Sequence, residues 1–311
     1  MGFFDRFYYG KAGKRDYSEA DMPKNRISLF FLVLKDHFFD LMKVNLLQVV
    51  FWIPFFIWTM LSFLASQEIR VDPAAEGAAQ EWLSQFSGHI LLWLTGAVPC
   101  IAITGPSTAA AAYILRNWSK DQHAFLWSDY KEAFQKNWKQ ALPLSTITGA
   151  VPAVLFAAVL FYSQLARENI ILYIPLILTA TAGFVYSLML VVLYPMMVGY
   201  ELKFRDLIKN AFLMALAQLP KTVLARLITV IPVAVVCIGI FSGNGIALLV
   251  VCLYYAVFGL AFTRLVYASV ANAIFDIYLN PRIEGAVVGA GLRPSNTDEP
   301  EEDGEDEEDE V

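Results

Sequence analysis

The run from Pro99 to Thr108, PCIAITGPST, contains the residues of this chain that are best placed to bind a ligand. It interrupts a long apolar stretch with prolines, a glycine and hydroxyl side chains. Proline removes a backbone donor and kinks or breaks a helix, and the freed amides and carbonyls must then be satisfied by protein, water or ligand. The run therefore predicts a solute or partner site, formed by Pro99, Thr104, Gly105, Pro106, Ser107 and Thr108.

Packing is the alternative interpretation of the same run. The small residues Ala109 to Ala112 follow it directly, and small side chains let two helices approach closely. Under either interpretation the helix should break at Gly105-Pro106. Ser107 or Thr108 is then expected to cap the resumed helix, with Pro106 near its start.

Side chains that commonly catalyse reactions are scattered along the chain. His37, His89 and His123 lack the spacing of metal ligands, and no HExxH, Walker or nucleophile-elbow motif is present. The three cysteines lie within apolar runs and form no CxxC pair. Catalysis within a membrane needs at least a nucleophile or a metal together with a base. We therefore expect no catalytic residue, no metal, no cofactor and no enzymatic activity.

Composition indicates the elements that position these residues. The chain is 57% hydrophobic and 17% charged, whereas about a quarter of the residues in a soluble domain are charged. The apolar residues gather in runs of about twenty, the length that crosses about 30 Å of hydrocarbon. We predict an all-α, polytopic membrane protein with six transmembrane helices, near residues 41–65, 89 through the 99–108 run, 141–162, 170–197, 223–241 and 246–271.

The ends of the chain flank this transmembrane domain. We assign residues 1–40 to an N-terminal cytoplasmic or interfacial segment, 41–278 to the spans, 279–297 to a cytoplasmic linker and 298–311 to a disordered acidic tail. All of the 23 Lys and Arg except Arg70 and Arg167 fall on one side of the predicted spans. The positive-inside rule then places both termini in the cytoplasm.

A short pattern precedes each odd-numbered span: Lys35-x-x-Phe38, Lys131-x-x-Phe134 and Lys209-x-x-Phe212. It suggests three repeated hairpins, each led by a cytoplasmic amphipathic helix at the interface. The alternative is convergence, because any segment entering a membrane favours Lys and Phe. We expect interfacial contacts with the lipid bilayer, rather than with nucleic acid, at Lys131, Phe134, Trp138, Lys209 and Phe212.

The segment from Pro99 through GPSTAAAAYILRNW to FLWSDYKEAFQKNWKQA resembles the YesL-like family of bacterial membrane proteins, a group described as a domain of unknown function. The resemblance is specific over about residues 90–142. It implies no catalytic residue. It does imply a link with carbohydrate uptake systems that contain binding-protein-dependent, ABC-type transporters.

Two functions remain compatible with the sequence. The first is a non-enzymatic accessory or scaffold protein associated with ABC sugar transporter subunits. The second is a permease for a small neutral solute, with the broken second helix lining the path. The predicted spans contain neutral polar groups such as Asn45, Gln48 and Thr104, whereas a proton-coupled transporter would normally need a buried carboxylate or histidine.

Overall fold

A computed structural model describes residues 22–72, 74, 76–167, 169–241 and 245–293. The acidic tail at 298–311 and most of the N-terminal basic segment therefore lie outside the described residues. In this part of the chain all regular elements are helical, as predicted. They are α2 (Arg26–Asp36), α3 (Phe38–Ser66), α4 (Ala78–Ala102), α5 (Gly105–Trp118), α6 (Leu126–Leu165), η2 (Ile170–Leu172), α7 (Tyr173–Gly199), α8 (Phe204–Ala217), α9 (Leu219–Phe241), α10 (Gly245–Tyr254), the π-helical turn η3 (Tyr255–Gly259), α11 (Leu260–Tyr278) and η4 (Asn280–Arg282).

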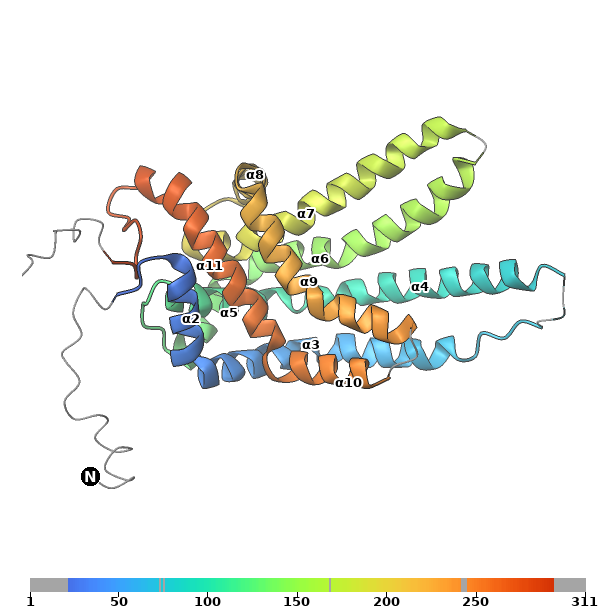
Figure 1. Ribbon diagram of the computed structural model, residues 1–311, viewed down its shortest axis with the longest axis horizontal. Coiled ribbons are helices and arrows are strands. Elements are labelled where there is room, and N and C mark those ends of the chain that lie inside the picture. The colour runs from blue at the N-terminus through green and yellow to red at the C-terminus, as the bar shows by residue number, and fades with distance from the viewer. Residues whose placement is uncertain (1–21, 73, 75, 168, 242–244, 294–311) are drawn as a thin grey trace, which may run out of the picture.

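Two long hairpins, α3–α4 and α6–α7, project from a base in which α5 is central (Figure 1). The α9–α10 pair forms a third, shorter hairpin. A helical segment precedes each hairpin: α2, the first turns of α6, and α8. The three junctions differ, because His37 separates α2 from α3, α6 runs on without a break, and α8 meets α9 at an angle of 96°.

Five helices are long and apolar enough to cross a membrane, or up to six if the bent α8–α9 pair counts as one span. The second span differs from the sequence prediction. It is α4 alone, which begins at Ala78 rather than near His89 and ends at Ala102. α5 is a separate 14-residue helix that is buried along most of its length. Gly77, with φ +81°, allows the chain to enter α4 earlier than hydropathy suggested.

The burial pattern separates the hairpins from the base. None of the most apolar window of α3 is buried by the rest of the chain, and its exposed side chains include Ile57, Met60 and Leu61. Such a surface suits hydrocarbon. In contrast, α5 contributes to two hydrophobic clusters and packs against α3, α6, α7 and α11. The packed core of the protein therefore lies in the base.

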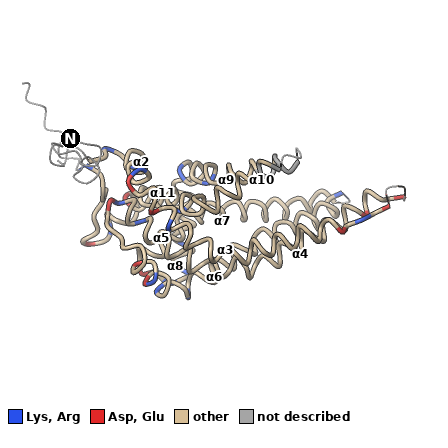
Figure 2. Tube along the Cα trace, turned by 90° about the horizontal axis from the view of Figure 1, so that it is seen from below, with Lys and Arg blue, Asp and Glu red and all other residues tan. Residues whose placement is uncertain are grey.

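Charged residues follow the same division. Lys and Arg concentrate around the base, whereas few charges lie along the hairpins (Figure 2). Arg70 follows the end of α3 and Arg167 follows the end of α6, so both lie at hairpin tips, as the sequence predicted.

Asn45 of α3 joins the first and last spans. Its side-chain Nδ2 donates to the carbonyls of Tyr255 and Ala256 at 3.0 and 2.9 Å. Its Oδ1 accepts from the amides of Leu260 and Ala261 at 2.9 and 3.1 Å. A π-helical turn changes the regular backbone pairing of a helix, and this fully buried amide supplies partners for the groups around η3.

We predict that Asn45→Leu destabilises the protein by about 1–3 kcal/mol, because backbone groups of η3 and α11 lose their partners. Gln48→Leu provides a matched control one turn further along α3. Gln48 is also buried, but its Nε2 has no partner among the described residues, so its replacement should be neutral or stabilising. Thermal unfolding of the purified variants in detergent measures both effects. Equal destabilisation by the two substitutions would contradict this role for Asn45.

Candidate functional site

The predicted break in the second apolar run is present. α4 ends at Ala102 and α5 begins at Gly105, with Pro106 in the first turn of α5. The expected capping is wrong. Ser107 and Thr108 lie inside α5, and the Ser107 Oγ is 2.7 Å from the Tyr130 hydroxyl of α6. Thr104 does not cap α5 either, because its Oγ1 donates back to the Ile101 carbonyl at 2.8 Å.

Ser145 of α6 satisfies a carbonyl that the break exposes. Its Oγ lies 2.6 Å from the Ala102 carbonyl oxygen at the end of α4, and 2.9 Å from the Ala141 carbonyl of its own helix. The hydroxyl has one proton and can donate to one of these carbonyls at a time. Because Ser145 is buried, a side chain of the protein takes the place that water or a ligand would otherwise occupy at this point.

Gly105 brings the backbones of α5 and α6 into direct contact. A Cβ at this position would collide with the Ser145 Oγ and with the Ala141 carbonyl. The four alanines Ala109 to Ala112 are all buried behind it. This close approach is the packing that the small residues of the sequence indicated as the alternative to a ligand site.

The six predicted site residues separate into two environments. Thr104, Ser107 and Thr108 are at most 3% exposed, and Gly105 and Pro106 are buried with them. Pro99 lies inside α4 and is exposed, so it does not join the other five. The two cavities found in the base are lined by other residues.

The predicted interfacial residues mostly face outward. Lys131, Trp138, Lys209 and Phe212 are exposed on α6 and α8, as membrane-surface contacts require. Phe134 is half-buried instead, and its ring packs 5.4 Å from that of Phe51 on α3. It therefore also anchors α6 to the first hairpin.

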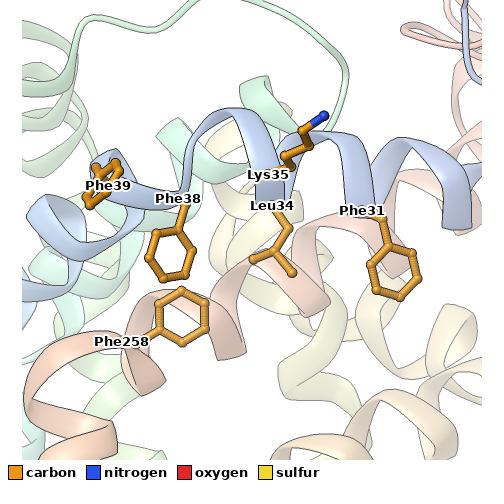
Figure 3. A pocket seen from close by; sticks show the side chains of 6 residues that line it. All are labelled: Phe31, Leu34, Lys35, Phe38, Phe39 and Phe258. Atoms are coloured by element: carbon orange, nitrogen blue, oxygen red, sulfur yellow. The ribbon is translucent and has the colours of Figure 1, made fainter. Parts of the chain in front are cut away.

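The Lys35-x-x-Phe38 copy of the pattern borders an open apolar groove of about 690 Å³ at the α2–α3 junction. Figure 3 shows the side chains of Leu34, Phe38 and Phe258 converging, while the Lys35 ammonium extends away from them. The groove joins the start of the first hairpin to the π-helical turn of the last span. Apart from Lys35, whose ammonium points away, its lining residues are apolar and cannot fix the orientation of a solute.

Two arginines form a polar cluster that the sequence did not predict. Arg226 of α9 donates to the Tyr267 hydroxyl at 2.7 Å, and the Arg264 guanidinium lies 5.2 Å from the centre of the Tyr194 ring. Arg226 was missed because it lies in the first turns of a long apolar run. Within the described ranges, no three His, Cys, Asp or Glu side chains come together as a metal site would require.

We predict that Gly105→Ala destabilises the protein by about 1–3 kcal/mol, since the added methyl group must displace Ser145 or the α6 backbone. Gly88→Ala is the matched control. Gly88 is also helical, but a Cβ there meets nothing within 4 Å, so alanine should be neutral or stabilising. Thermal unfolding measures both variants. Similar stability of the two would show that α5 and α6 do not require this close contact.

Comparisons with known proteins do not assign an activity. A family model described as "Protein of unknown function, DUF624" matches residues 88–159, which cover the larger, C-terminal part of α4, the break, α5 and most of α6. The chain is similar to the uncharacterized protein YteU of Bacillus subtilis (strain 168). The two are 28% identical over 160 residues, which are 48% of this chain and 68% of that protein. No solved structure matches the chain significantly. The run from Pro99 to Thr108 thus lies within the region that matches this family of unknown function.

Proposed function

We propose that this protein is a non-enzymatic, multi-span membrane protein that acts as an accessory or scaffold subunit. The observation that carries this proposal is the closed break between α4 and α5. Thr104, Ser107 and Thr108 are buried, and the Ser145 hydroxyl lies within hydrogen-bonding distance of the Ala102 carbonyl. The hydroxyls of Thr104 and Ser107 and the Ala102 carbonyl already have partners within the chain, which supports a packing role over a path for a solute.

The hairpins offer the surface for such a role. α6–α7 diverges from α3–α4 away from the base (Figure 1), and both carry large exposed apolar side chains. On α7 these include Ile174, Ile177 and Leu178. Lipid or the helices of another membrane protein can cover this kind of surface equally well.

The association with ABC-type carbohydrate uptake is the finer part of the proposal. It is supported by the resemblance of residues 90–142 to the YesL-like family. The base supplies a second reason to expect partners. Lys and Arg gather there, and if the base faces the cytoplasm, these side chains would be accessible to cytoplasmic transporter domains.

We further propose that the base faces the cytoplasm of a bacterial plasma membrane. The asymmetry of Lys and Arg between the base and the hairpin tips supports this orientation. The N-terminal part of α2 and the segment after α11 both lie at the base, which would put both termini on the same side.

Cysteine labelling tests the orientation. In a cysteine-free background, Asp72→Cys at the α3–α4 tip should react with a membrane-impermeant maleimide in intact cells, because the tip is expected outside. Lys136→Cys at the base should react only after permeabilisation. Both positions are exposed in the structure, so access across the membrane decides the result. Labelling with the opposite pattern would reverse the proposed topology.

Affinity purification from native membranes tests the scaffold role. The tagged full-length chain should recover subunits of an ABC-type sugar transporter after mild solubilisation, because the exposed helices would pack against them. Purification of the protein without any transporter subunit would contradict the proposal.

Proteoliposome uptake separates the scaffold from the permease. The purified protein should give no saccharide flux above that of empty liposomes. Flux that is reduced by Pro106→Ala at the break, but kept by the control Pro54→Ala within α3, would instead support the permease.

A further inference from the structure

A cavity of about 340 Å³ opens in the base, away from the α4–α5 break. It lies where the last turn of α5, the end of α7 and the segment after α11 meet. Arg116, Lys120 and Gln122 form one wall, Gly199 and Tyr200 form another, and Asn280 with residues from Ile283 to Ala290 completes the lining. Two of its polar side chains are therefore cationic, and none of the lining residues is acidic.

Arg116 is the central side chain of this cavity. The residue is only 8% exposed, and its Nε has no hydrogen-bond partner. Its guanidinium lies 5.2 Å from the centre of the Tyr200 ring. Among the described residues, no carboxylate forms an ion pair with it. A buried cation without a carboxylate partner is unfavourable, so the pocket favours an anion.

Nearby acceptors are already occupied. Asp276 pairs with Arg26 at 2.5 Å, and its other oxygen accepts from the Asn280 Nδ2 at 2.7 Å. At the end of α5, the Ser119 carbonyl accepts from Arg26 at 3.1 Å, and the Arg116 carbonyl accepts from the Asn272 Nδ2 at 3.3 Å. These bonds hold the walls of the cavity together. Asp276 offsets only part of the positive charge, because its attraction for Lys120 is smaller than the opposing effects of burial and of Arg116.

Lys120 adds a second cation beside Arg116. Burial, followed by the repulsion of the Arg116 guanidinium, lowers the pKa of Lys120 to about 8. A bound anion would oppose both effects, since it would attract the protonated amine. Gly199 provides the space for this arrangement, because a Cβ there would collide with the Arg116 guanidinium.

We propose that this cavity binds a phosphate group, held by the Arg116 guanidinium and the Lys120 ammonium. The planar fork of arginine matches two phosphate oxygens, and the lysine supplies a point charge for a third. The same chemistry fits the phosphate of a lipid headgroup and that of a soluble phosphate ester. The site is independent of the scaffold proposal, because it requires no contact with a transporter.

Inorganic phosphate is the first probe. Thermal unfolding of the full-length protein in detergent is compared in sodium phosphate and in sodium chloride at equal ionic strength. Binding to the native state should raise the Tm, and Arg116→Gln should remove this shift. Affinity measured by isothermal titration should fall about tenfold or more in Arg116→Gln, as expected for a lost charge-assisted hydrogen bond.

Control variants separate binding from a general salt effect. Phosphate is excluded from protein surfaces and can stabilise any fold, but that effect would be equal in all variants. Lys136→Gln removes an exposed cation of the base and should keep the full shift. Lys120→Gln should weaken binding while leaving buried Arg116 in place, so it still tests the site if Arg116→Gln fails to fold. Gly199→Ala should weaken binding by displacing the guanidinium.

Two further ligands distinguish the sources of phosphate. Glycerol 3-phosphate represents a soluble ester, and vesicles of phosphatidic acid, compared with phosphatidylcholine vesicles, represent a lipid headgroup. If binding of glycerol 3-phosphate or of phosphatidic acid vesicles depends on Arg116 and Lys120, the result supports the proposal and shows whether the phosphate is soluble or part of a lipid. The proposal would be overturned if phosphate did not raise the Tm of the wild type. It would also be overturned if phosphate raised the Tm of the wild type, Arg116→Gln and Lys120→Gln equally.

Discussion

The need to satisfy backbone polar groups within a largely apolar fold governs this structure. At two places where a helix departs from regular pairing, a side chain from another helix supplies the missing partner. Ser145 of α6 meets the Ala102 carbonyl where α4 ends, and Asn45 of α3 meets the backbone around η3. In hydrocarbon an unpaired backbone group costs several kcal/mol, so these contacts determine which helices must be neighbours.

The base follows from the same constraint. α5 is too short to cross a bilayer, and it is enclosed by α3, α6, α7 and α11. Gly105 and four alanines make this enclosure possible, because larger side chains would separate the helices. Polar side chains then link the outer layer of the base. The Gln140 Nε2 donates to the Leu202 carbonyl at 2.9 Å, and the Gln218 Nε2 donates to the Tyr278 hydroxyl at 3.1 Å. Each of these glutamines lies six residues after the Phe of the second or the third Lys-x-x-Phe copy.

In the described part of the chain, the base contains both a region whose polar groups are satisfied within the chain and a cavity with an unpaired cation. At the α4–α5 break, the hydroxyls of Thr104 and Ser107 have partners within the chain. At the other end of α5, the cavity contains Arg116, a cationic group without an acidic partner among the described residues. The first feature suits a packing scaffold. The second is the kind of exception that a ligand explains, because a buried guanidinium is otherwise unfavourable. A scaffold with a phosphate site could respond to a lipid or a metabolite while it holds a partner.

Sequence by itself determined the helical class, the hairpin order, the asymmetry of charge and the break before Gly105. These features depend on local composition. A run of apolar residues favours a span, a Gly-Pro pair breaks a helix, and the distribution of Lys and Arg sets the orientation, whichever helices become neighbours. Tertiary structure alone decided that Ser107 faces Tyr130, that Asn45 meets η3, and that Arg116 and Lys120 share a cavity with residues more than 150 positions away, such as Asn280. These outcomes depend on which helices are neighbours, because a polar group acquires its role from the partner that packing brings within hydrogen-bonding distance.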